Sequence, residues 1–84
     1  PVLNTHMAIA HRLLGENAAA RQLLDETIAL FPEYGRSYLE LSTLNAIEGR
    51  HGEALAHLER AVALRPSSAS LRRLAAERAA AAGR

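Results

Sequence analysis

The chain contains no cysteine, tryptophan or lysine, and its only aromatic residues are one phenylalanine and two tyrosines. Without cysteine it can form neither a disulfide framework nor a thiolate metal site. No apolar run approaches the roughly 18 residues that a membrane span requires. Nucleic-acid recognition usually needs a dense basic face with interleaved aromatics, and a net charge of +1 offers little of this. We therefore expect neither a membrane nor a nucleic-acid partner.

The residues that are present recur at a fixed interval. Gly15, Gly49 and Gly83 are evenly spaced, and Pro32 and Pro66 are separated by the same distance. This repeat interval also separates three apolar pairs, Ala20 and Ala54, Leu24 and Leu58, and Leu30 and Leu64. A period of about 34 residues is typical of stacked helical hairpins. Such arrays present a curved surface to another molecule and rarely carry out chemistry.

Apolar residues at helical spacing predict five helices and no strand, because no segment alternates with a period of two. The helices are expected over residues 2–14, 18–30, 35–48, 52–64 and 69–82. Phe31 is expected on the buried side of the second helix. The loops between these helices are short, so we expect sequential helices to lie side by side and antiparallel. The predicted class is all-α.

Several residues fit the predicted helix ends. Gly15 and Gly49 can adopt the positive φ that often terminates a helix. Asn17 is suited to cap the second helix, and either Ser67 or Ser68 is suited to cap the fifth. The sequence does not choose between the two serines.

With the sequence aligned at the repeat interval, the chain resembles the tetratricopeptide repeat family. The second repeat, residues 35–68, carries the pattern best, through Tyr38, Leu41, Ser42, Gly49, Ala54, Leu58, Ala61 and Pro66. The first repeat, residues 1–34, carries it through Met7, Ala8, Gly15, Ala20, Leu24 and Pro32. Asn4 replaces the aromatic residue of the pattern, and Thr27 replaces an alanine.

The resemblance implies a right-handed α–α superhelix of about two and a half repeats, built from five antiparallel helices in one domain, residues 1–84. Residues 69–84 would form a half-repeat or a capping helix, with Arg72 where the family has an aromatic residue. Small residues at Ala8, Ser42 and Ala54 agree with this scheme, because helices that cross closely leave little room for a side chain.

Catalysis is a poor fit to this sequence. Asp25 is the only aspartate, and no combination of serine, histidine and acid forms a convincing triad. Glu53 and His57 lie four residues apart and could both touch a metal ion, but two ligands do not make a zinc site. We expect no enzyme activity, no cofactor and no metal site.

In the tetratricopeptide family the first helix of each repeat lines a concave groove. Carried onto this chain, the groove residues are Thr5, Ile9, Arg12, Arg36, Leu39, Glu40, Thr43, Arg73, Leu74 and Glu77. Some relatives grip a C-terminal carboxylate with Lys, Asn and Arg at such places, and this chain lacks that set. Ile9, Leu39 and Leu74 form an apolar strip that either faces the groove or packs between repeats.

The resemblance implies a module that binds a protein or peptide on this groove. All ten basic residues are arginine, which we interpret as the codon bias of a GC-rich genome, and we expect a bacterial-type protein. The sequence starts at Pro1 rather than Met, so we expect it to be a piece of a larger protein. One alternative is a self-assembly module, with weak homo-oligomerisation through the alanine-rich last helix. Another is a regulatory domain attached to an enzyme or a nucleic-acid-binding domain. No compartment follows from the sequence, although the cytoplasm is favoured.

Overall fold

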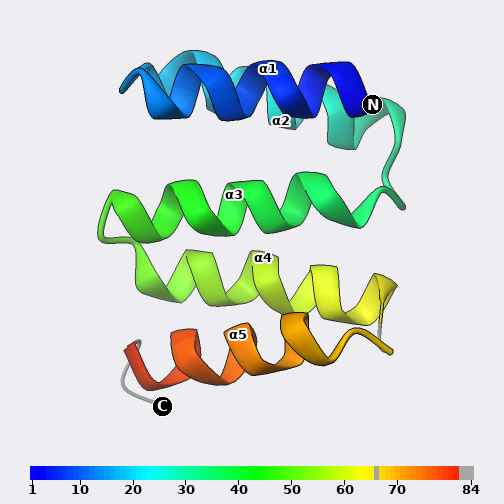
Figure 1. Cartoon of the computed structure of the whole chain (residues 1–84), viewed down its shortest axis with the longest axis vertical. Coiled ribbons are helices and arrows are strands. Elements are labelled where there is room, and N and C mark those ends of the chain that lie inside the picture. The colour runs from blue at the N-terminus through cyan, green and yellow to red at the C-terminus, as the bar shows by residue number, and fades with distance from the viewer. Residues whose placement is uncertain (66, 82–84) are drawn as a thin grey trace.

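The computed structural model of the chain describes residues 1–65 and 67–81. It contains five α-helices, α1 (Val2–Leu13), α2 (Asn17–Leu30), α3 (Gly35–Ile47), α4 (His51–Leu64) and α5 (Ala69–Ala81). Consecutive helices run in opposite directions and form a stack with α1 and α2 side by side at one end and α5 at the other (Figure 1). The described residues contain no strand. The predicted all-α class with five helices is confirmed, while Pro66 and Gly83 lie outside the described residues.

The ends of the helices recur at the same interval as the repeated residues of the sequence. Helices α2 and α4 begin at Asn17 and His51 and end at Leu30 and Leu64, so both their bounds differ by the distance between Gly15 and Gly49. Helices α1 and α3 end at Leu13 and Ile47, which are separated by the same distance. The first two hairpins are therefore built to the same plan.

The turns that close these hairpins have the same backbone geometry. Gly15 has a φ of 80° and Gly49 a φ of 78°. The residue after each glycine donates its N–H to a carbonyl in the last turn of the preceding helix, Glu16 to His11 and Arg50 to Asn45, both at 2.8 Å. This bond and the positive φ are the features of a Schellman motif. The glycine positions predicted to end α1 and α3 are confirmed.

The predicted caps are correct for α5 and wrong for α2. The N–H of Leu71 donates to Oγ of Ser68 at 3.3 Å, so Ser68 rather than Ser67 caps α5. Helix α2 already includes Asn17, its N-cap residue is Glu16, and no side-chain cap bond is found there among the described residues. The backbone of Glu16 is held in the Schellman turn, which brings the start of α2 forward by one residue.

The core lies where α3 packs against the first hairpin. Ala8, Ala20 and Leu24 of that hairpin form one cluster with Leu41 and Leu44 of α3, and all five are at most 2% exposed. On its other side α3 packs along α4. The prediction for Phe31 is wrong, because this side chain is 43% exposed. Phe31 follows the last residue of α2 with a φ of −135°, so it leaves the helical path before it can join the core.

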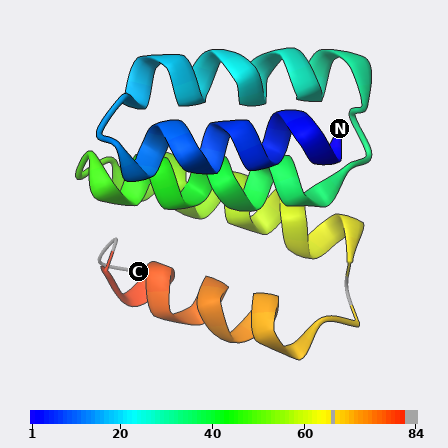
Figure 2. The same cartoon turned by 45° about the horizontal axis from the view of Figure 1, so that its top comes forward.

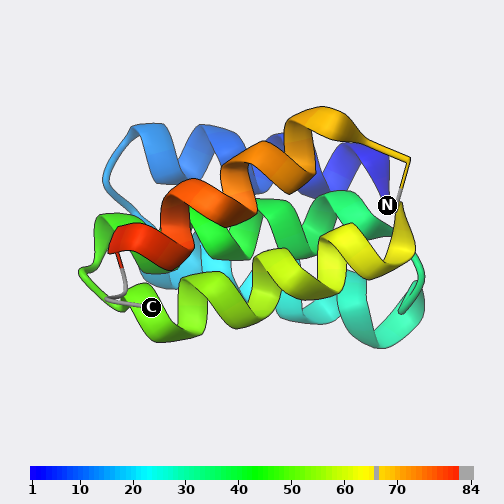
Figure 3. The ribbon, with the colours of Figure 1, turned by 90° about the horizontal axis from the view of Figure 1, so that it is seen from below.

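Helix α5 is attached less closely than the others. It packs beside α4 (Figure 3), and none of its described residues is buried. Helices α1 and α3 contact each other, whereas no described Cα of α5 lies within 8 Å of a Cα of α3. Figure 2 shows α5 set apart from α3. The relation between α1 and α3 is therefore not repeated between α3 and α5.

Candidate functional site

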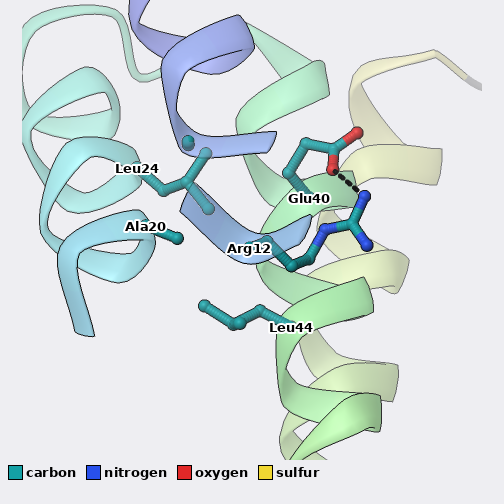
Figure 4. A pocket seen from close by; sticks show the side chains of 6 residues that line it. Arg12, Ala20, Leu24, Glu40 and Leu44 are labelled. Atoms are coloured by element: carbon teal, nitrogen blue, oxygen red, sulfur yellow. Dashed lines mark ion pairs between the residues drawn. The ribbon is translucent and has the colours of Figure 1, made fainter. Parts of the chain in front are cut away.

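Three charged side chains meet where α1 lies beside α3. Glu40 of α3 is only 6% exposed. Nε of Arg36, one helical turn earlier, donates to Oε1 of Glu40 at 3.0 Å. From α1, Nη2 of Arg12 lies 3.9 Å from Oε2 of the same carboxylate, and Figure 4 shows this ion pair. Because an unpaired buried charge is costly, the two arginines explain why a glutamate is tolerated here.

This cluster carries more positive than negative charge and has hydrogen-bond donors to spare. Two guanidinium groups face one carboxylate, and each guanidinium has five N–H donors. The side chain of Arg36 is 52% exposed. The side chain of Arg12 is 21% exposed, while its Nε is buried and without a hydrogen-bond partner among the described residues, so only its terminal nitrogens can meet a surface ligand. An anionic group reaching this surface could therefore bind both arginines.

The space beneath the cluster is filled. It is lined by Ala8, Arg12, Ala20, Leu24, Glu40 and Leu44, whose side chains leave no room for a small molecule (Figure 4). A ligand at this site must therefore lie on the surface, across the exposed parts of Arg12 and Arg36.

An open depression adjoins the cluster at the start of α3. Its volume is about 300 Å³, and it is lined by Glu33, Tyr34, Gly35, Arg36, Leu64 and Arg65. Arg36 belongs to both the ion-pair cluster and this depression. A partner segment that binds Arg36 can therefore also reach this depression, which Arg65 lines as well.

The other predicted groove residues of α1 and α3 are partly accessible. Ile9, Leu39 and Thr43 are all half-buried. The hydroxyl of Thr43 donates to the carbonyl of Leu39 at 3.2 Å, within their own helix. The apolar portions of Ile9 and Leu39 can contribute contact area beside the charged cluster.

The predicted groove residues of α5 do not join this surface. Arg73 and Glu77 are exposed and Leu74 is half-buried, but α5 packs on α4 and its described backbone stays away from α3. The structure therefore brings together Arg12 of α1 with Arg36 and Glu40 of α3 and leaves the predicted residues of α5 on a separate helix.

Two predicted groove residues are buried. Thr5 is 1% exposed, and its hydroxyl donates to the carbonyl of Pro1 at 2.8 Å. Its expected exposure on a groove is wrong, because the internal hydrogen bond lets this polar side chain face the hairpin interior. Glu40 is also buried, and its carboxylate holds Arg12 and Arg36 in place instead of being open to a partner.

Sequence reasoning missed one buried polar pair. Asn45 is fully buried, and its amide nitrogen lies 2.8 Å from Nδ1 of His57, which joins α3 to α4. From the sequence, His57 and Glu53 are two possible ligands of a metal ion. In the structure the carboxylate of Glu53 lies 3.9 Å from the guanidinium of Arg50. An asparagine twelve residues before a histidine is no recognisable motif, so only the fold reveals the pair.

No group of three or more residues suited to bind a metal ion lies together in residues 1–65 and 67–81. Each of the described helices is too short or too polar to cross a membrane. A comparison with models of known protein families and a search of curated proteins both gave no match to this chain.

Proposed function

We propose that this chain is a tetratricopeptide-like interaction module of a larger protein, with its helical hairpins stacked as a right-handed superhelix. It binds a segment of a protein or peptide partner across α1 and α3. In the two hairpins the ends of the first helices and both bounds of the second helices are one repeat interval apart, and the glycine turns match; both observations support the repeat assignment.

The observation that carries the binding proposal is the pair of arginines around one buried carboxylate. Arg36 lies 3.0 Å and Arg12 3.9 Å from Glu40, so the cluster keeps a positive charge that a partner can neutralise. Charge-assisted bonds between arginine and carboxylate are among the stronger hydrogen bonds in proteins. We therefore propose a partner segment that offers Asp or Glu side chains to Arg12 and Arg36, with apolar contacts to Ile9 and Leu39.

A library of random peptides displayed on phage, selected on the full chain, tests this proposal. We expect the enriched peptides to contain Asp or Glu, and their affinity to fall as salt screens the charges. Fluorescence anisotropy with the best peptide should show at least a tenfold loss of affinity for Arg36→Gln. The matched control is Arg50→Gln, since Arg50 is 55% exposed and also pairs with a nearby glutamate, Glu53.

Either of two results would contradict the proposal. The first is enrichment of peptides without acidic residues. The second is an equal loss of affinity in Arg36→Gln and Arg50→Gln, which would show a general effect of charge and no local binding at the α1–α3 face.

A further inference from the structure

Helix α1 has an apolar stripe on the side opposite its buried residues. We define the α1 stripe as Leu3, Met7, Ala10 and Leu14. Leu3 is 71%, Met7 42% and Leu14 75% exposed, and Ala10 is exposed as well. Thr5 and Ala8, the buried residues of α1, lie on the other side of the helix. Large leucines this exposed and in line are unusual on a protein surface, where such patches commonly mark interaction sites.

The second repeat shows what this face does when it is covered. The residues one repeat interval after Leu3, Met7 and Ala10 are Ser37, Leu41 and Leu44, and all three are at most 2% exposed. Leu41 and Leu44 pack against the first hairpin in the main core cluster. In α1 the equivalent residues Leu3, Met7 and Ala10 are exposed. Three residues of the α1 stripe, Leu3, Met7 and Ala10, thus form a packing face that no described helix covers.

The spacing of the stripe is self-complementary. Its residues are separated by four, three and four positions, a pattern that is the same in both directions along the helix and matches a coiled-coil seam. In an antiparallel pair with a two-fold axis between residues 8 and 9, Leu3 lies opposite the second copy's Leu14. Met7 then lies opposite the second copy's Ala10, which places a long side chain against a small one.

Charge favours the same arrangement. Helix α1 contains no acidic residue, and its first turn has no side-chain cap among the described residues. Glu16, shortly after α1, is 53% exposed and lies 3.2 Å from His11. In the antiparallel pair, Glu16 of each copy comes to the first turn of the other copy's α1, where a helix favours negative charge. A parallel pair would instead place the two Glu16 carboxylates side by side.

We propose that the α1 stripe is closed by a second copy of this chain, with the two α1 helices antiparallel. The large exposed apolar residues of the described chain lie on α1, at the end of α2 and on α3, and none lies on α5. The stripe is therefore a stronger candidate for self-association than the alanine-rich last helix. This inference is independent of the proposed peptide site, because it uses the opposite side of α1 from Arg12.

Sedimentation equilibrium of the full chain, from low micromolar to near-millimolar concentration, tests the surface. We expect a monomer–dimer equilibrium and at least a tenfold weaker dimer in Met7→Glu. Ile47→Glu is the matched control, since Ile47 is 57% exposed and lies on α3 away from the stripe. Both variants should keep their helicity by circular dichroism because both side chains are accessible.

Engineered cysteines test the direction of the pair, because the natural chain has none. A mixture of Leu3→Cys and Leu14→Cys should form disulfide-linked heterodimers under mild oxidation. Each variant alone should not, since identical positions would lie about 16 Å apart along the helix axis. A disulfide requires Cα atoms closer than about 7 Å.

Three results would overturn the proposal. A chain that stays monomeric at every concentration would assign the stripe to a different partner or to a preceding segment of the protein. A dimer equally weakened by Ile47→Glu would place the contact elsewhere. Disulfide formation by Leu3→Cys alone, as efficient as in the mixture, would exclude the antiparallel pair.

Discussion

The hydroxyl of Ser42 in α3 donates a 2.6 Å hydrogen bond to the backbone carbonyl of Ala54 in α4. Both residues are fully buried, so the two backbones approach closely at this point. One repeat interval earlier, Ala8 and Ala20 occupy the equivalent places in α1 and α2 and are each 1% exposed. Small residues at both crossings allow the helices of each hairpin to pack closely.

Ala54→Leu should therefore destabilise the chain. The added atoms have no space between α3 and α4, and overpacking of a core typically costs about 1–3 kcal/mol. Urea unfolding followed by circular dichroism would measure the loss. Ala56→Leu is the matched control because Ala56 is exposed on the same helix and should change stability little. Equal stability of the two variants would mean that Ala54 does not mark a close crossing.

Two glycines near the α3–α4 turn should respond in opposite directions to alanine. At Gly49, with a φ of 78°, a side chain is disfavoured by about 1–2 kcal/mol. At Gly52, inside α4, an added Cβ meets nothing within 4 Å, and alanine should stabilise the helix by about 0.5–1 kcal/mol. Thermal melting of both variants checks the sign of each change. A stabilised Gly49→Ala variant would contradict the Schellman turn.

The sequence predicts the helices of this chain well because the residues that end them act through local backbone geometry. Gly15 and Gly49 end helices through their own backbone freedom, and this requirement is readable without any tertiary information. Phe31 shows the limit of such reasoning. Its apolar character and spacing favour burial, yet its burial depends on the path that the chain takes after α2, which periodicity does not contain.

The candidate site was predictable in outline and not in detail. The family resemblance placed Arg12, Arg36 and Glu40 on one face, and the structure brings them together. The resemblance could not indicate that Thr5 turns inward. The hydroxyl of Thr5 is satisfied by a bond to its own backbone segment, so this side chain can be buried like an apolar one. Nor could the resemblance indicate that α5 leaves the surface, since that depends on how the last helix packs on α4.

Glu40→Gln should lower stability and strengthen binding of an acidic peptide. The substitution keeps the shape of the side chain but removes the buried charge that Arg36 and Arg12 share, at a cost on the order of 1 kcal/mol. It also leaves both guanidinium groups without their anion. Glu53→Gln is the control, since Glu53 is 61% exposed and an exposed pair contributes about 0–1 kcal/mol. Parallel urea unfolding and anisotropy titrations test both effects, and weaker peptide binding by Glu40→Gln would contradict the role assigned to the arginines.

Helix α5 should open independently of the rest of the chain. It has no buried residue among those described and packs on α4 alone of the described helices, whereas α3 is buried against helices on both sides. Helices with few buried contacts open at lower free energy than the global unfolding of the protein. Native-state hydrogen exchange should therefore show amides of α5 exchanging faster than those of α3 under the same conditions. The alanine-rich composition of α5 does not change this expectation, because an isolated helix of this length is marginal in water. Equal protection of α5 and α3 would show that all the helices unfold as one unit, and that α5 is held more firmly than its burial indicates.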